Sequence, residues 1–128
     1  APASPGKAGR LLPLLDHPAA TLYVNLEEAN ILARSECTSA IDAAKALLDR
    51  GAGRVLVTHG GDLAAEGRKG QGVIRGQPPK VLVTRVTGAG DTFMAAHLVA
   101  ERRGADRQAA LDEALRAAAT YVSGEIGS

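Results

Sequence analysis

The sequence contains few aromatic residues, almost no cysteine and no marked excess of either charge. Among its 128 residues there are two Tyr, one Phe, no Trp and one Cys, at position 37. A single thiol excludes an intramolecular disulfide and argues against a cysteine-based zinc site. The scarcity of aromatic rings argues against base-stacking surfaces for single-stranded nucleic acid. The core must therefore be built mainly from Ala, Leu and Val.

Charge and hydropathy narrow the class of protein further. Lys and Arg number 15 against 14 Asp and Glu, so the totals indicate neither a nucleic-acid footprint nor a patch for anionic membranes. No apolar run approaches the ~20 residues that a membrane helix needs, and the first residues lack the basic-then-apolar order of a signal peptide. We therefore expect a soluble, cytoplasmic protein, with one domain as the default at this length.

The pattern of apolar residues predicts an α/β fold. Short apolar runs predict strands over 21–24, 54–58 and 81–84, and alternation around a glycine-rich turn predicts one β-hairpin over 63–77. Capping and periodicity signals predict helices over 25–33, 39–50, 92–103 and 107–122. This order of elements is typical of layered folds with parallel crossovers. Residues 1–9, rich in Pro, Gly and Ser, predict a linker or truncated end before a domain over 10–128.

One glycine-rich turn stands between a predicted strand and a predicted helix. Gly88, Ala89 and Gly90 carry little or no side chain, so an anion could approach the unpaired amides of the helix start. Asp91 follows them, and a carboxylate beside a phosphate is repelled unless it does chemistry or meets a cation. Transfer of a phosphoryl group to an alcohol would use both the amides and the carboxylate. The amides would hold the phosphate, and Asp91 could accept the hydroxyl proton. The alternative is an ordinary first-turn acid, which stabilises a helix by ~0.3–1 kcal/mol.

Three motifs in order resemble one family of enzymes. The run TGAGDTF at 87–93 is similar to the second signature of the ribokinase-like, or PfkB-type, carbohydrate kinases. NLEE at 25–28 resembles that family's Asn-x-x-Glu, and THG at 58–60 resembles its Thr-x-Gly. The form VTGAGD also resembles pseudouridine-kinase-like members. The resemblance implies a partial ribokinase-like domain, a Rossmann-like three-layer α/β/α fold with a mainly parallel sheet and one β-hairpin, corresponding to the C-terminal, nucleotide-side portion of the family.

The resemblance also implies roles for the glycine turn. Asp91 would be the catalytic base, and the amides of Gly88, Ala89 and Gly90 would form the anion hole for the transferred phosphate. The cofactors implied are ATP and Mg²⁺.

On the nucleotide side, the resemblance implies that Asn25, Thr58 and Gly60 bind ATP. Glu28 would act on Mg²⁺ through water, in keeping with the waters that magnesium retains. Simpler structural roles are open for each motif: a helix capping box for Asn25 and Glu28, and an ordinary strand-to-loop turn after Thr58.

The sequence departs from the family pattern in several places. Arg85 and Val86 replace the usual short polar residues before the glycine turn, which makes a monovalent-cation site doubtful. His97 replaces a usually aliphatic helix position, and we expect a structural role for it. Arg68 and Lys69 lie at the predicted hairpin tip, where we expect both side chains to be solvated. The N-terminal half that supplies the family's sugar pocket has no counterpart here.

Two hypotheses for function follow. The first is ATP-dependent phosphoryl transfer to a hydroxyl of a sugar or nucleoside. The second is a non-catalytic, truncated module that binds nucleotide or phosphate, or serves in assembly. Because a truncated parallel sheet exposes an edge, we also expect self-association or pairing with a missing N-terminal half. We expect no nucleic-acid or membrane partner.

Overall fold

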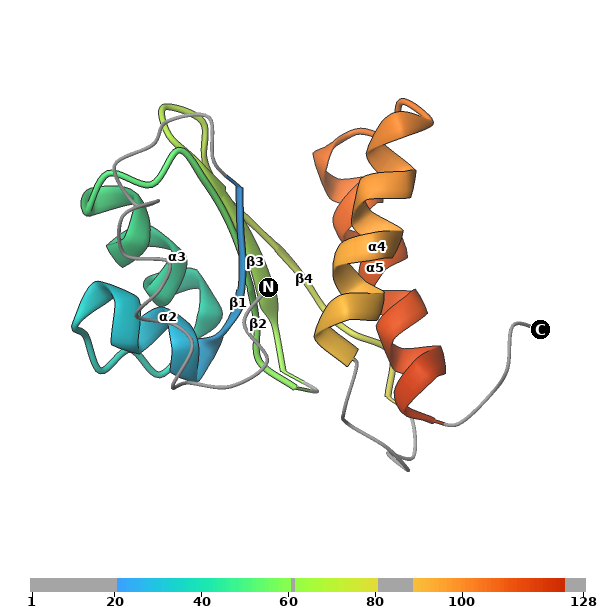
Figure 1. Cartoon of the computed structure of the whole chain (residues 1–128), viewed down its shortest axis with the longest axis horizontal. Helices are drawn as coiled ribbons and strands as arrows, with labels where there is room; N and C mark the ends of the chain where they lie inside the picture. Colours follow the sequence, from blue (N-terminus) through green and yellow to red (C-terminus); the bar gives the residue numbers. More distant parts are fainter. Residues whose placement is uncertain (1–20, 61, 81–88, 124–128) are drawn as a thin grey trace.

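A computed structural model describes residues 21–60, 62–80 and 89–123 of the chain. The helices and strands in this part are, in chain order, β1 (Thr21–Asn25), α2 (Leu26–Ala33), α3 (Ala40–Asp49), β2 (Arg54–Thr58), β3 (Ala64–Arg68), β4 (Gly72–Gly76), α4 (Ala89–Arg102) and α5 (Arg107–Val122). Figure 1 shows a sheet between two pairs of helices, the layered arrangement predicted from the sequence. The predicted linker over 1–9 and the predicted strand over 81–84 lie outside the described residues.

The described strands form one sheet in the order β1-β2-β3-β4. β1 and β2 run parallel, and the register places Asn25 opposite Thr58 at their carboxyl ends. β3 is antiparallel to both β2 and β4, which confirms the predicted hairpin. The parallel part of the described sheet is therefore the β1–β2 pair, and the hairpin extends it on one side.

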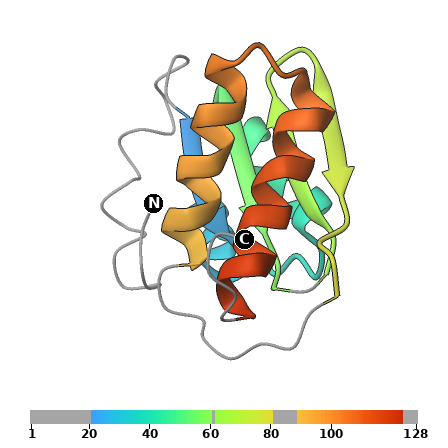
Figure 2. The same ribbon diagram turned by 90° about the vertical axis from the view of Figure 1, so that its right-hand side faces the viewer.

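Both faces of the sheet are covered by helices, as the two views show (Figures 1 and 2). Successive strand residues point to opposite faces, so the two helix pairs pack against different residues of the same strands. α2 and α3 cover the face formed by Leu22, Val24, Val55, Val57 and Ala65. On the opposite face, α4 and α5 pack through Phe93, Leu111, Ala114 and Leu115 against Tyr23, Leu56 and Ala64. Burial on both faces explains why β1 and β2 read as nearly continuous apolar runs.

The helix starts follow from local side-chain chemistry. Ser39 accepts a hydrogen bond from the Asp42 amide at the start of α3, and Asp106 accepts one from the Ala109 amide at the start of α5. Each cap satisfies one of the amides that has no partner inside its helix. α4 begins at Ala89, three residues before the predicted start. Glycine is tolerated at a helix terminus, so Ala89 and Gly90 form the start of the helix rather than preceding it.

α5 rests directly on the main chain of β4. A Cβ atom added at Gly76 would lie 2.7 Å from Leu115 Cδ1 and 3.1 Å from Leu111 Cδ2. Carbon atoms in ordinary contact are 3.5–4.0 Å apart, so any larger residue at position 76 would force these leucine side chains to shift. In the described part of the chain, no helix has the length and apolar character needed to span a bilayer.

Candidate active site

The carboxyl ends of the two parallel strands bring two predicted site residues side by side. Asn25 ends β1 and Thr58 ends β2, and the two residues are paired in the sheet register. In open α/β sheets, ligands bind outside the carboxyl ends of the strands. Asn25 is exposed and Thr58 is half-buried, so both can be reached from solvent at this end of the sheet.

Asn25 and Glu28 form the reciprocal capping box that their spacing predicts. The Glu28 amide donates to Asn25 Oδ1 at 2.7 Å, and the Asn25 amide donates to Glu28 Oε1 at 2.8 Å. Glu28 is only 2% exposed, yet its second oxygen, Oε2, is buried without a hydrogen-bond partner among the described residues. Burial raises the pKa of Glu28, and the hydrogen bond from Asn25 only partly offsets this effect. The cap therefore uses one carboxylate oxygen and leaves the other buried without a partner among the described residues.

The first turn of α4 contains the predicted anion hole and base. Ala89 and Gly90 are its first two residues, and Asp91 is the acid of the turn. Gly90 and Asp91 are exposed, and a Cβ atom added at Gly90 would meet nothing within 4 Å. The first four amides of a helix have no intrahelical acceptor, so an anion can approach them here. Gly88 lies outside the described residues.

α4 begins at the end of the molecule where β1 ends. Figures 1 and 2 both show the start of α4 at the end of the sheet from which α2 departs, and α4 packs against β1. Since β2 runs parallel to β1, its carboxyl end also lies there. The structure thus gathers Asn25, Thr58 and the α4 start at one end of the sheet. Arg85 and Val86, on which the monovalent-cation prediction depends, lie outside the described residues.

The loop after β2 makes a tight turn that contains Gly60. Gly60 has a φ of 55° and is exposed, and the Asp62 amide donates to the His59 carbonyl at 2.9 Å. A positive φ is readily adopted by glycine, so Gly60 is explained by the turn itself. Gly60 is exposed, so a ligand at the end of β2 could reach its main chain.

A buried ionic cluster lies on the face of the sheet that α4 and α5 cover. The sequence did not predict it. Glu66, in the middle of β3, is 0% exposed. Its carboxylate accepts hydrogen bonds from Arg54 Nη2 at 2.9 Å, from Arg68 Nε at 3.1 Å and from Arg107 Nε at 2.5 Å. The prediction that Arg68 is solvated was wrong, because its guanidinium turns inward to this carboxylate; Lys69 is exposed as expected. The sequence signal was a lone acid among small residues in a strand.

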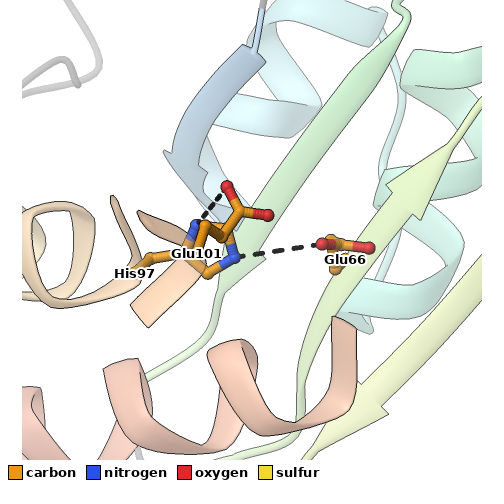
Figure 3. A group of neighbouring side chains, drawn as sticks. All are labelled: Glu66, His97 and Glu101. Atoms are coloured by element: carbon orange, nitrogen blue, oxygen red, sulfur yellow. Dashed lines mark ion pairs between the residues drawn. The ribbon is translucent and has the colours of Figure 1, made fainter. Parts of the chain in front are cut away.

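His97 and Glu101, one turn apart on α4, complete the cluster (Figure 3). His97 is 0% exposed, and its ring lies between two carboxylates. Nε2 is 3.9 Å from Glu66 Oε2 and Nδ1 is 3.8 Å from Glu101 Oε1. A hydrogen bond of 2.8 Å joins His97 Nδ1 to the Tyr23 hydroxyl on β1. The structural role expected for His97 thus takes the form of a polar contact between α4 and the sheet.

The charges of the cluster perturb its members in a consistent way. Burial opposes ionisation of Glu66, but the hydrogen bonds from Arg107, Arg54 and Arg68 outweigh it and hold its pKa below the usual value. The hydrogen bond from Arg54 likewise lowers the pKa of Glu101. Burial lowers the pKa of His97 and raises that of Tyr23 to about 12. The cluster therefore holds ionised carboxylates, a neutral imidazole and a neutral phenol.

Three ligand atoms from Glu66, His97 and Glu101 lie within 4.8 Å of one another, which is a spacing that a metal ion could use. The arginines around these carboxylates argue against a metal site here. Each of the four carboxylate oxygens already accepts a hydrogen bond from a guanidinium group. A cation at the same point would displace these bonds and be repelled by the arginines. The geometry fits an ion-pair network.

Comparison with known proteins gives a family match over almost the whole chain. The model of the pfkB family of carbohydrate kinases matches residues 2–125. Among curated proteins, none is similar enough to match.

Solved kinase structures share the fold. Arabidopsis thaliana ribokinase, in complex with ribose and ATP, is 29% identical with a TM-score of 0.75 over 91% of this chain and 38% of its own. Adenosine kinase from Sinorhizobium meliloti is 24% identical with a TM-score of 0.77, over 94% of this chain and 36% of its own. A putative ribokinase II from E. coli, in complex with ATP and Mg²⁺, is 24% identical with a TM-score of 0.71, over 93% and 37% respectively. The chain thus spans less than two fifths of the length of these structures, and the ribokinase-like fold class predicted from the sequence is confirmed.

Proposed function

Because this chain belongs to the pfkB family of carbohydrate kinases, we propose that it forms the nucleotide-side part of a cytoplasmic, ATP-dependent enzyme. The enzyme transfers a phosphoryl group from ATP to a hydroxyl of a sugar or nucleoside. The observation that carries the proposal is the convergence at one end of the sheet: the first turn of α4, with Asp91, begins where β1 and β2 end. Residues 10–128 would form the C-terminal part of the kinase domain.

In the proposed reaction, Asp91 accepts the proton of the acceptor hydroxyl as its oxygen attacks the phosphorus atom. The amides of Gly88, Ala89 and Gly90 stabilise the negative charge that develops on the transferred group. Support comes from the open space around Gly90 and the exposure of Asp91. The partial positive charge of the α4 N-terminus acts in the same direction.

ATP would be held across the carboxyl ends of β1 and β2 by Thr58, Gly60 and Asn25. The Oδ1 atom of Asn25 is used in the helix cap, so a phosphate contact would be made through its side-chain NH₂ group. The unpartnered Oε2 of Glu28 fits an acceptor for a water of hydrated Mg²⁺, which usually keeps several waters. Bound Mg²⁺ would neutralise phosphate charge. Glu28 can serve it without leaving the helix cap, because the two roles use different oxygens.

Replacing Asp91 with Asn tests the catalytic role. In the longest natural polypeptide that contains this sequence, we expect Asp91→Asn to lower kcat roughly 10²–10⁴-fold, the usual contribution of a general base, with the Kd for ATP little changed. Asp42→Asn is a matched control, because Asp42 is also an exposed first-turn acid, on α3. If Asp91→Asn turns over as fast as Asp42→Asn, Asp91 is only a helix-stabilising residue.

A second candidate function is a non-catalytic module that binds nucleotide or phosphate. The observation in its favour is that the chain spans only 36–38% of the three kinase structures compared. Titration calorimetry of the 128-residue chain with ATP, with and without Mg²⁺, separates the candidates. A partial kinase site gives Mg²⁺-dependent binding, a phosphate-binding module gives Mg²⁺-independent binding, and a purely structural unit gives no heat at millimolar nucleotide.

We further propose that the chain self-associates or pairs with polypeptide corresponding to the N-terminal half of the family. Among the described strands, β1 pairs with β2 alone, although Leu22, Tyr23 and Val24 are buried on both faces of the sheet. The outer edge of β1 has no partner among the described strands, and a strand edge of this kind offers main-chain donors and acceptors to another strand.

A further inference from the structure

The contacts between α4 and the sheet differ in how well they fix the helix along its axis. Phe93 is the buried apolar residue of α4 that packs with Tyr23 and Leu56 of the sheet, and apolar contacts are not directional. A hydrogen bond, in contrast, weakens steeply when its distance or angle changes. The polar contacts of α4 are therefore the ones most sensitive to where the helix stands along its axis.

The first polar contact joins α4 to β1. His97 lies six residues after Asp91, about 9 Å along the helix at a rise of ~1.5 Å per residue. Its Nδ1 atom is hydrogen-bonded to the Tyr23 hydroxyl at 2.8 Å, and Tyr23 lies two residues before Asn25 on the same strand. This bond therefore connects the helix that carries Asp91 to the strand that ends at Asn25.

The second polar contact joins α4 to β2. Arg54 Nη1 donates to Glu101 Oε1 at 2.9 Å, and Arg54 Nη2 donates to Glu101 Oε2. Paired hydrogen bonds of this kind fix orientation as well as distance. Arg54 begins the strand that ends at Thr58, so this contact connects α4 to the second strand of the candidate site.

Aromatic packing restricts the helix between Asp91 and His97. The Phe93 and His97 rings stack at 6.2 Å between centroids, with an angle of 11° between their planes. The Tyr23 ring meets both edge-on, at 6.3 Å from Phe93 and 5.6 Å from His97. The tether thus continues from His97 to a residue only two positions after Asp91.

We propose that His97 and Glu101 are positioning residues, which hold α4 through Tyr23 and Arg54 so that Asp91 and the first-turn amides face the ends of β1 and β2. The proposal rests on the proposed function for its catalytic consequence. The structural part of the proposal, that these contacts fix the axial position of α4, does not depend on the proposed function. His97 touches no reacting atom in this arrangement and acts only through the placement of the helix.

Tyr23→Phe is the sharpest test, because it removes one hydroxyl group and retains the ring contacts. Tyr121→Phe, on α5, is the matched control outside the cluster. In the longest natural polypeptide containing this sequence, we expect Tyr23→Phe to lower kcat roughly tenfold or more, since small misplacements of catalytic groups are costly. The KM for ATP should change less than about twofold, because the nucleotide contacts remain. His97→Leu should behave like Tyr23→Phe, and His97→Gln should recover part of kcat by restoring a polar partner.

Amide hydrogen exchange of the 128-residue chain, followed by NMR at residues 93–97 of α4, gives a readout that does not require activity. We expect Tyr23→Phe to accelerate exchange there severalfold more than Tyr121→Phe. Unchanged exchange overturns the tether. Faster exchange with unchanged kcat in an enzyme that depends on Asp91 shows that the cluster only stabilises the fold. If Asp91→Asn itself leaves kcat unchanged, the proposed function fails, and exchange alone decides whether α4 is held in this way.

Discussion

Replacing Glu66 with Gln tests the energetic importance of the buried ionic cluster. Gln is nearly the same size but removes the charge that three guanidinium groups share, and its NH₂ group would face arginine donors. Glu66 is 0% exposed, so solvent cannot compensate for the lost charge. Removing one partner of a buried ion pair costs about 3–5 kcal/mol. Typical domains have a stability of roughly 5–15 kcal/mol, so the variant should lose a large part of the total.

Urea unfolding followed by far-ultraviolet circular dichroism measures this loss, since the chain has no Trp to report by fluorescence. In thermal unfolding followed by the same signal, Tm should fall by roughly 12–20 °C, at about 4 °C per kcal/mol for a domain of this size. Glu113→Gln makes the same chemical change in an exposed ion pair with Arg103. Such pairs contribute about 0–1 kcal/mol. If both variants lose the same stability, the reasoning from burial and charge is wrong.

Two further predictions concern pH and assembly. The pKa of Glu66 is lower in the folded protein than its ordinary value of 4.5, so its stabilising effect is complete above pH 4.5 and is lost as pH falls through the folded pKa. The pKa of His97 is also lowered, from an ordinary value of 6.5. Protonation of His97 in the unfolded state therefore favours unfolding below pH 6.5. We therefore expect Tm to fall from about pH 6.5 downward, less steeply in Glu66→Gln, and a pH-independent Tm between 7 and 3 would contradict this. Light scattering over a wide concentration range should give an apparent mass that rises above that of one chain, whereas a constant monomer mass would argue against pairing through β1.

Features set by neighbouring residues could be predicted from the sequence. The cap of α2 depends on Asn25 and Glu28, three residues apart, and the structure forms both of its hydrogen bonds. The β3–β4 hairpin follows from a glycine-rich turn between two short runs. The three-layer arrangement follows from the order of the elements. These contacts are local, or follow from topology, so the residue types alone are sufficient to indicate them.

The ionic cluster could not be predicted, because its members come from five separate elements, β1, β2, β3, α4 and α5. Glu66 meets arginines at positions 54, 68 and 107, and no local pattern relates these positions. Only the three-dimensional packing turns Arg68 inward rather than toward solvent. The candidate site shows the same division: the motifs indicated its residues, but whether they converge depends on sheet register and on the position of α4. Gly88 lies outside the described residues and its role remains a prediction.

The absence of a side chain at Gly76 has a consequence for the distant end of the helical layer. α5 sits on the β4 main chain through two leucine methyl groups, and α5 packs along α4 as a helical hairpin. A methyl group at position 76 would press on these two leucine side chains, so the packing of α5 on β4 would have to adjust. Because α5 packs along α4, a change in how α5 rests on β4 can be passed on to the helix that carries Asp91, in addition to the contacts that α4 itself makes with the sheet.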